Sequence, residues 1–243
     1  MRKVESSPGS ARPRHADDSA LAPAEKPGTR KTGAAAAKPP RARKVTAEAR
    51  RQAILKAALS VFAEHGFAAA RLDDVAARAG VAKGTLYLYF KDKVDLFEAL
   101  VRNAASPVLA QVGQLVASPD IKPEQAIEAL YAVFEREVLG TERKLLLRLI
   151  MAEGPRFPAI AEFYYREVVS KGLAAMRVLA DRAARGGNLA TDAPARYPQL
   201  IVAPLLMAVI WDGLFAKIDP LDVHGLLGAY RDLLRGKTGK ETP

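Results

Sequence analysis

Residues 73–93 read DDVAARAGVAKGTLYLYFKDK, and the arrangement of helices follows most directly from this stretch. A short helix stops at Gly80, which tolerates the positive φ of a tight turn, and a second helical segment runs from Ala82 to Phe90. Two helices joined in this way predict a helix-turn-helix, although an ordinary helical hairpin has similar spacing. The residues that meet its packing requirements are Ala76, Gly80, Val81 and Leu86.

The helix that precedes this motif is marked at both ends. Thr46 is a suitable N-cap with Glu48 in the first turn, and apolar side chains recur at helical spacing until Gly66. The apolar stripe consists of Ile54, Leu55, Ala58, Leu59 and Phe62. We therefore predict a three-helix DNA-binding head over residues 45–92.

The remainder of the chain keeps helical spacing and has no alternating strand pattern. Proline and glycine breaks separate predicted helices at 92–117, 123–139, 141–153, 158–185, 195–217 and 222–235. The prediction is an all-α protein of about nine helices. A C-terminal helical bundle is expected over residues 93–236, and residues 237–243 are expected to be flexible.

Residues 1–44 have a composition typical of a disordered basic tail. They contain eleven Lys and Arg, four Asp and Glu, and no aromatic residue, so most of the net charge of +10 lies there. The run from Lys38 to Lys44 is suited to contact DNA phosphates, and a solubilising role is an equal alternative. DNA binding must therefore be argued from the motif rather than from the total charge.

Several classes of function are disfavoured by composition. The chain has no Cys, and His15, His65 and His224 are too far apart to form a helical metal-binding pair, so we expect no metal and no cofactor. No phosphate loop or nucleophile motif is present, which argues against an enzyme with catalytic residues. The N-terminus lacks the apolar region of a signal peptide, and the longest apolar run is too short to span a membrane, so we expect a cytoplasmic protein.

The head resembles a known family. The segments FAEHGF at 62–67 and DDVAARAGVAKGTLYLYFKDK at 73–93 resemble the DNA-binding head of the tetracycline-repressor family, TetR/AcrR. The segment LRLIMAEGPRFP at 147–158 resembles its efflux-regulator branch. The resemblance implies an all-α homodimer that reads double-stranded DNA at an inverted repeat and responds to a small-molecule effector.

The resemblance also assigns positions at the DNA. Lys83, Thr85 and Leu88 are implied to face base edges, where Lys reads guanine acceptors and apolar groups meet the thymine methyl. Tyr87 and Tyr89 are implied to face the backbone. The full set of expected DNA-binding residues is Arg71, Lys83, Gly84, Thr85, Tyr87, Leu88, Tyr89 and Lys93.

Some of these positions have alternatives. Tyr87 would also suit the core, whereas Tyr89 is expected on the DNA face because Leu86 and Phe90 supply the packing. Ala70 and Arg71 stand where the family commonly has a capping Thr or Ser, so we expect a weak cap, with Arg71 as a phosphate contact instead. Asp73 and Asp74 lie in the first turn of a helix, where their negative charges interact favourably with the helix dipole. We do not expect them to form a catalytic pair.

Aromatic residues of the bundle predict a ligand cavity. Met207, Trp211 and Phe215 recur every fourth residue and share one helix face. Facing surface is expected from Tyr131, Phe134, Leu146, Ile150, Phe163 and Tyr164. By themselves these residues fit an ordinary filled core better, and the resemblance is what favours a cavity for an apolar or amphipathic compound.

The last two predicted helices are expected to form the dimer contact. Residues 199–216 are apolar on every face, more than packing within one subunit requires. The expected interface residues are Val202, Leu206, Val209, Leu226, Leu227, Tyr230 and Leu234. The sequence therefore predicts a dimeric transcriptional repressor that a ligand releases, with an activator or a non-specific DNA-packaging protein as alternatives.

Overall fold

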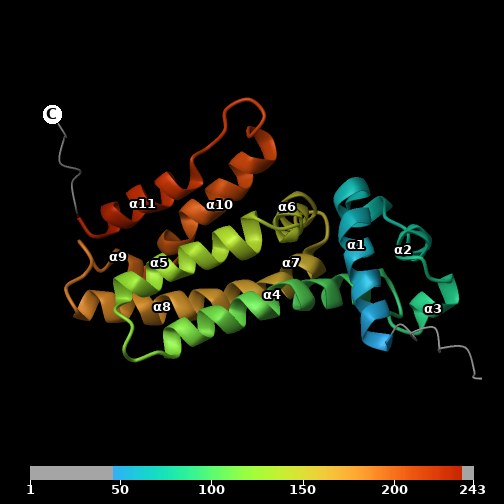
Figure 1. Cartoon of the computed structure of the whole chain (residues 1–243), viewed down its shortest axis with the longest axis horizontal. Helices are drawn as coiled ribbons and strands as arrows, with labels where there is room; N and C mark the ends of the chain where they lie inside the picture. Colours follow the sequence, from blue (N-terminus) through green and yellow to red (C-terminus); the bar gives the residue numbers. More distant parts are fainter. Residues whose placement is uncertain (1–45, 237–243) are drawn as a thin grey trace, which may run out of the picture. The chain divides into compact units, whose positions relative to one another are not determined.

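A computed structural model describes residues 46–236, which are helical and contain no strand, so the predicted all-α fold is confirmed for this part of the chain (Figure 1). The predictions for the tail 1–44 and for residues 237–243 lie outside the described residues. The helices of the N-terminal half are α1 (Ala47–Ala69), α2 (Leu72–Ala79), α3 (Lys83–Tyr87), α4 (Lys93–Ala117) and α5 (Pro123–Phe134) with the π-helix η1 (Glu135–Leu139). They are followed by α6 (Arg143–Glu153), α7 (Pro158–Tyr164), the π-helix η2 (Tyr165–Val169), α8 (Ser170–Arg185), α9 (Ala193–Arg196), α10 (Gln199–Leu214) and α11 (Val223–Leu234).

Local signals set the helix ends of the head as expected. The Thr46 hydroxyl accepts a hydrogen bond from the Ala49 amide at 3.2 Å, and α1 is interrupted at Gly66, where φ is 74°. Gly80 takes the left-handed conformation in the turn between α2 and α3. Arg71 makes no side-chain cap for α2, which agrees with the weak cap predicted there.

The head is held together by aromatic packing. The Phe67 ring lies 5.6 Å from that of Phe62 and 5.5 Å from that of Phe97 on α4. Phe157, from the loop before α7, packs edge-on against Phe67 at 5.1 Å. One buried cluster therefore includes the head and the start of the bundle. The division at residues 92–93 stays a prediction, because no break in the core marks it.

The bundle departs from regular α-helix at three places. The predicted helices 123–139 and 158–185 are continuous, but each contains a five-residue π-helical stretch, η1 and η2. The predicted helix 195–217 is divided into α9 and α10 at Tyr197 and Pro198, because a residue that precedes proline is biased away from helical ψ. These irregularities leave the order of the helices unchanged.

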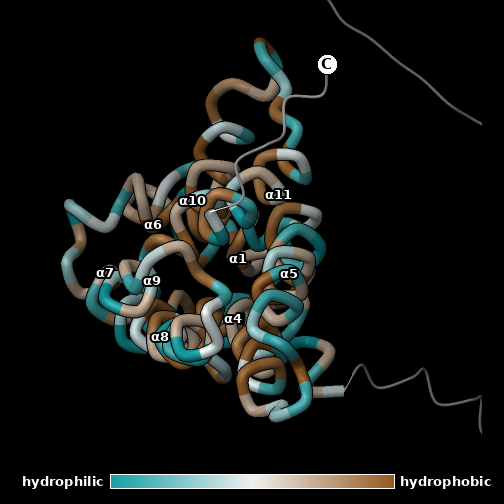
Figure 2. The backbone as a smooth tube through the Cα atoms, turned by 90° about the vertical axis from the view of Figure 1, so that its left-hand side faces the viewer, coloured by the Kyte–Doolittle hydropathy of each residue, from teal (hydrophilic) through white to brown (hydrophobic). Residues whose placement is uncertain are grey.

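A second buried cluster joins α4, α5, α8, α10 and α11 at the end of the bundle away from the head. Ile201 is fully buried in it, and the Tyr131 hydroxyl donates a 3.1 Å hydrogen bond to the Ile201 carbonyl. Figure 2 shows hydrophobic residues along most of α10, whereas α5 alternates between hydrophobic and hydrophilic positions. Since α10 is apolar beyond the face that it buries, part of its apolar surface is left exposed.

Candidate functional site

The helix α3 presents a solvent-exposed face. Leu86 is completely buried and anchors the helix to the head, while its neighbours Tyr87 and Leu88 are 46% and 84% exposed. A leucine this exposed gains nothing from the fold by itself, so it is available for a partner. Gly84 is also exposed, so a partner's surface can approach the backbone closely here.

Lys83, at the first position of α3, is held by an acidic residue of α2. Its ammonium group lies 2.8 Å from a carboxylate oxygen of Asp73, and both side chains are largely exposed. The hydrogen bond and charge of Asp73 raise the pKa of Lys83. Lys83 is therefore charged at neutral pH, and it must exchange Asp73 for any new acceptor.

A shallow hollow lies beside α3 and reaches the first turn of α1. The residues that line it are Arg50, Gly80, Val81, Ala82, Thr85, Leu88 and Tyr89. Arg50 is exposed and brings a positive charge to the hollow beside α3. The hollow thus combines a cation with hydroxyl groups, which suits contact with a phosphate backbone.

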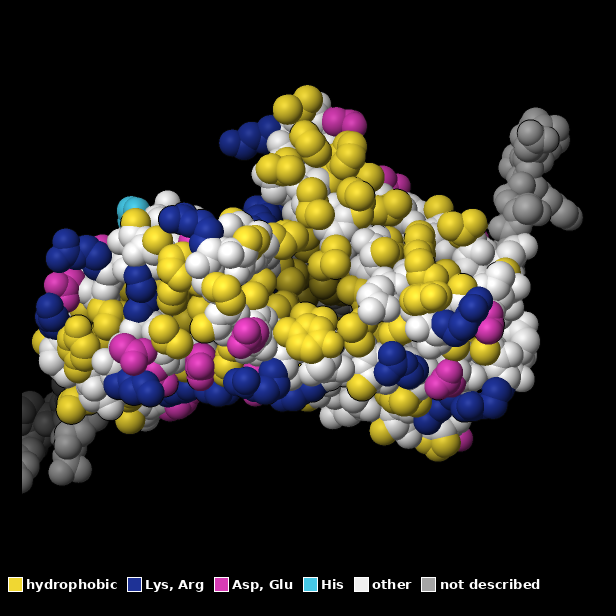
Figure 3. Space-filling model, turned by 180° about the vertical axis from the view of Figure 1, so that it is seen from behind, with side chains coloured by type: hydrophobic (Ala, Val, Ile, Leu, Met, Phe, Trp, Pro, Cys, Tyr) yellow, Lys and Arg dark blue, Asp and Glu magenta, His cyan; other side chains and the backbone are white. Residues whose placement is uncertain are grey.

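A cavity of about 290 Å³ lies within the bundle. Its walls come from α4, α5, α6, α8 and α10, and both π-helical stretches contribute side chains, with Val138 from η1 and Val168 and Val169 from η2. π-Helical turns are rare and occur often at functional sites. The walls are almost entirely apolar. Figure 3, which views the molecule from behind relative to Figure 1, shows a hollow with hydrophobic walls.

Few polar groups face this cavity. Arg143 is already bound to Glu137, with 2.8 Å between the guanidinium and carboxylate groups, and hydrogen bonds from Arg136 and Arg143 lower the pKa of Glu137. Burial raises the pKa of Tyr164, so its hydroxyl group stays protonated. The cavity therefore suits an uncharged apolar compound better than one with an anionic group.

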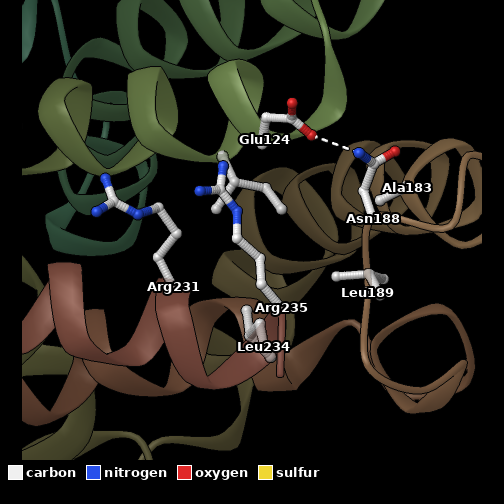
Figure 4. Close-up of a pocket in the computed structure, with 8 residues that line it drawn as sticks. Glu124, Ala183, Asn188, Leu189, Arg231, Leu234 and Arg235 are labelled. Atoms are coloured by element: carbon white, nitrogen blue, oxygen red, sulfur yellow. Dashed lines mark hydrogen bonds between the residues drawn. The ribbon is translucent and has the colours of Figure 1, made fainter. Parts of the chain in front are cut away.

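A second hollow lies between α5, α11 and the loop after α8, and it is too small for such a compound (Figure 4). Its volume is about 10 Å³, roughly the space for one water molecule. Asn188 donates a 2.7 Å hydrogen bond to Glu124, and Arg231 of α11 forms an ion pair with Glu128 of α5. The ion pair fixes α11 to α5, and the hydrogen bond fixes the loop after α8 to α5, so both contacts have a structural role.

The bundle also contains a charged connection between α6 and α10. Asp212 forms ion pairs with Arg148 and, at 2.9 Å, with Lys144. The hydrogen bond from Lys144 and the charges of both bases lower the pKa of Asp212. Because α6 also lines the cavity and contacts α1, this cluster ties the exposed helix α10 to an element shared by cavity and head.

Sequence comparisons agree with this arrangement. The sequence model described as "Bacterial regulatory proteins, tetR family" matches residues 54–100, and the one described as "AefR-like transcriptional repressor, C-terminal domain" matches residues 127–223. The HTH-type transcriptional repressor BepR of Brucella suis is 30% identical over 176 residues, which cover 69% of this chain and 79% of BepR. The chain belongs to the TetR family of transcription regulators.

Solved structures share the fold of this TetR-family regulator. The SmeT–triclosan complex has a TM-score of 0.61 at 23% identity and covers 80% of this chain and 93% of its own. The regulator FadR from Bacillus subtilis in complex with stearoyl-CoA has a TM-score of 0.60 at 19% identity and covers 77% of this chain and 98% of its own. TetR-family proteins are regulators rather than enzymes. None of the helices described in this chain is long and apolar enough to cross a membrane.

The structure of this TetR-family regulator leaves most of the expected DNA-binding residues exposed. Arg71, Lys83, Gly84, Tyr87 and Leu88 are exposed, and Thr85 is half-buried at the hollow. The two tyrosines differ in exposure, and Tyr89 lines the hollow beside α3. Tyr87 is the exposed one, whereas Tyr89 is half-buried and packs against the core of the head.

Lys93 has a role within the head that the sequence did not reveal. Its ammonium group donates hydrogen bonds to the carbonyls of Ala68 at 2.8 Å and Ala70 at 3.2 Å, and it lies over the Phe67 ring. Desolvation lowers its pKa. The expected phosphate contact stays a prediction, and without DNA the ammonium group satisfies the carbonyls at the end of α1.

The expected ligand residues divide into two groups. Phe134, Leu146 and Tyr164 line the cavity. Ile150 and Phe163 belong instead to the core shared with the head, and Tyr131 is buried against α10. The remaining three, Met207, Trp211 and Phe215, do not line the cavity.

Trp211 illustrates why helical spacing was insufficient. Its indole nitrogen donates a 2.6 Å hydrogen bond to the Asp219 carbonyl, and its ring packs edge-on against Phe215 at 5.1 Å. These contacts bring the loop after α10 back onto the helix. The face predicted to line the cavity is thus turned away from it.

The expected dimer residues are also distributed between several environments. Val209 and Leu227 are buried within the subunit, so these two side chains are not available to a partner. Val202 and Leu206 line the cavity, and Leu206 is also 41% exposed. On α11 the side chains of Leu226, Tyr230 and Leu234 are half-buried.

Two positions were missed in the sequence. Arg50 lies at the α3 surface, and the basic pair Arg50–Arg51 in the first turns of α1 was the available signal. Gly172 lies in the cavity wall, where a glycine within a helix is unfavourable unless space is needed. Neither position follows from periodicity.

The Lys83–Asp73 pair yields a prediction. Asp73→Asn should strengthen binding to DNA several-fold, because it frees Lys83 and removes a negative charge from the DNA-facing surface. Lys83→Ala should weaken binding roughly 5- to 150-fold and relax the preference at one symmetric base pair. Fluorescence anisotropy with labelled DNA measures both. Asp74→Asn is the matched control, since it removes the same charge from the same helical turn, and an equal gain in this control would show that only net charge matters.

Proposed function

We propose that this chain is a homodimeric repressor that binds an inverted repeat in DNA through α3 and acts in the cytoplasm. We further propose that a small apolar or amphipathic compound in the cavity between α4, α5, α8 and α10 releases it. The observation that carries the proposal is the apolar cavity of about 290 Å³ in a chain that also presents an exposed recognition helix. The relatives SmeT and FadR, solved with triclosan and stearoyl-CoA, support a ligand-responsive role.

One helix supports the link between the cavity and the DNA. The first turns of α4 are part of the core of the head, with Leu96 and Phe97 completely buried. Ala104, Val108 and Val112 of the same helix line the cavity. A ligand that displaces α4 therefore moves the head, and it favours release only if it binds the DNA-incompetent arrangement more tightly.

A two-fold dimer determines the form of the DNA site. Two copies of α3 related by a two-fold axis enter successive major grooves about 34 to 36 Å apart. Selection from random DNA with the full-length protein should therefore return an inverted repeat. Recovery of binding that is indifferent to sequence, and that falls steeply with salt, would support the packaging alternative instead.

Ligand release is tested on the selected DNA. Triclosan and stearoyl-CoA are each titrated against the protein–DNA complex, and the melting temperature of the free protein is measured over the same concentrations. We expect triclosan to bind more tightly than stearoyl-CoA, because Arg143, the cationic residue of the wall, is neutralised by Glu137. If the protein selects an inverted repeat but neither compound dissociates the complex, DNA recognition is retained and the ligand-responsive role is contradicted.

A further inference from the structure

Two tyrosines of the bundle have hydroxyl groups that are shielded from water. Burial raises the pKa of both Tyr131 and Tyr164, so both hydroxyl groups stay protonated and can donate a hydrogen bond. The Tyr131 hydroxyl donates to the Ile201 carbonyl at 3.1 Å. Tyr164 lines the cavity, and within residues 46–236 its hydroxyl group has no hydrogen-bond partner. Since an unpaired polar group away from water is costly, a ligand that supplies an acceptor is favoured there.

The other polar side chains of the cavity wall are already satisfied. Arg143 donates hydrogen bonds to the carboxylate and to the carbonyl of Glu137, at 2.8 and 3.0 Å. Gln199, at the first position of α10, is exposed, so its amide group is within reach of water. In the described wall no unpaired cation stands ready to offset the charge of a buried carboxylate. A neutral acceptor therefore suits the Tyr164 hydroxyl better than an anionic one.

Tyr164 lies at the end of the cavity nearest the head. Like Ala104 of α4, it belongs to the wall and also to the core shared with the head. Val112 of α4 and Met176 of α8 line the cavity too, but they belong to the buried cluster at the far end of the bundle. Ala104 and Val112 are eight positions apart on one helix, which corresponds to roughly 12 Å. The cavity is thus elongated, with the donor at the head end and apolar walls beyond it.

We infer that the ligand of this cavity is a neutral, elongated compound with a carbonyl oxygen at one end, and that this oxygen accepts a hydrogen bond from the Tyr164 hydroxyl group. The apolar remainder of the compound lies along α4 and α8, among the aliphatic side chains of the wall. A site with a donor of this kind disfavours a compound that lacks an acceptor at the same place. The inference rests on the proposed function, since it specifies the compound that the cavity receives.

Two isomeric ketones test the inference on the full-length protein. Methyl nonyl ketone has its carbonyl group next to one end of the chain, and dipentyl ketone has it at the centre of a chain of the same length. Isothermal titration calorimetry should show that methyl nonyl ketone binds about two- to tenfold more tightly, the range expected for one neutral hydrogen bond. Tyr164→Phe should remove this advantage and leave the affinity for dipentyl ketone unchanged. Undecanoate, the anion with the same number of carbons, should bind more weakly than methyl nonyl ketone, and tighter binding would overturn the neutral acceptor.

The carbonyl stretching band of bound methyl nonyl ketone reports on the hydrogen bond directly. A hydrogen bond weakens the C=O bond, so the band should lie at lower frequency in the wild-type complex than in the complex with Tyr164→Phe. Infrared difference spectra measure this shift. Equal frequencies in the two complexes would show that Tyr164 only shapes the wall, and would overturn the inference.

Tyr131→Phe is the matched control, because it removes a hydroxyl group that does have a partner. It should lower the melting temperature of the free protein by about 2 to 4 °C and keep the preference for methyl nonyl ketone. Tyr164→Phe should not lower the melting temperature, because the hydroxyl group that it removes is unpaired. A loss equal to that of Tyr131→Phe would show that the fold itself satisfies the Tyr164 hydroxyl, and would overturn the inference.

The outcomes separate this inference from the proposed function. Unchanged affinity of Tyr164→Phe for methyl nonyl ketone overturns the role of the hydroxyl group, while release of DNA by the ketone would still support a ligand-responsive repressor. If neither ketone binds the wild type but triclosan does, the carbonyl class is wrong and the ligand site is retained. If none of these compounds binds, the ligand site fails and this inference with it, whereas selection of an inverted repeat is unaffected.

Discussion

Gly172→Phe is expected to abolish the ligand response while preserving DNA binding and raising thermal stability. Gly172 lies on α8 in the wall of the cavity, and a Cβ atom added there meets no atom within 4 Å. The cavity of about 290 Å³ exceeds the size of a phenyl ring. The ring therefore occupies the ligand's place without displacing the helices.

The stability gain has two sources. Replacing glycine within a helix lowers the backbone entropy lost on folding, a gain of roughly 0.5 to 1 kcal/mol for alanine and less for phenylalanine. Burial of the ring in the cavity adds to this. For a domain of this size, 1 kcal/mol corresponds to an increase of about 2 to 4 °C in the melting temperature.

The ligand response is measured as dissociation of the operator complex by the compound that releases the wild type. We expect half of the variant's DNA complex to dissociate only at a compound concentration at least a hundredfold higher than for the wild type. This factor corresponds to about 2.7 kcal/mol of lost binding free energy. Gly113→Ala is a matched control, since Gly113 is an exposed helical glycine on α4 that does not line the cavity. It should gain helix stability and keep the full response. If the compound dissociates the Gly172→Phe variant from DNA at the same concentration as the wild type, the ligand binds elsewhere.

Gly66→Ala is expected to destabilise the head by about 3 kcal/mol and to abolish DNA binding at temperatures where the wild type is folded. Gly66 interrupts α1 at φ 74° and ψ 166°, a region open almost only to glycine. A Cβ atom there also approaches the Glu153 carboxylate, on α6, to 2.7 Å. Phe67 follows directly and is the centre of the aromatic cluster, so relaxation of this backbone displaces the core.

Gly80→Asn is the matched comparison within the same head. Gly80 also has positive φ, but φ 67° and ψ 31° define the left-handed helical region, which asparagine tolerates, and no atom lies within 4 Å of an added Cβ. Gly80→Asn should therefore lower the free energy of unfolding by less than about 1 kcal/mol. Urea unfolding followed by circular dichroism compares the two variants. Equal costs would show that positive φ alone, rather than the glycine-only conformation, governs both positions.

The contribution of Glu153 is separable in the same experiment. Glu153→Ala combined with Gly66→Ala forms a double-mutant cycle. Since the clashing atom is the end of a flexible side chain, most of the loss should persist in the double variant. A full recovery would assign the cost to the carboxylate contact instead of the backbone.

Much of the fold could be predicted from the sequence because its signals are local. The Thr46 cap, the turn at Gly80 and the missing cap at Arg71 each depend on atoms within a few residues, and each is present as expected. Apolar spacing identified the helices of the bundle for the same reason, because a helix buries one face whichever partner it meets. The pattern of α2 and α3 was sufficient to place the family.

The cavity and the exposed apolar surface of α10 were decided only by tertiary packing. A leucine every three or four residues looks the same whether it meets the core, a ligand or a second copy, and so the sequence assigned Val209 and Leu227 to an interface although both are buried. The face of Trp211 was misassigned because the loop after α10 folds back to accept its hydrogen bond. The contacts of Lys93 within the head were missed because the carbonyls that it satisfies lie at the end of a different helix. In each case the deciding partner lies outside the helix that carries the residue, and spacing within one helix carries no information about it.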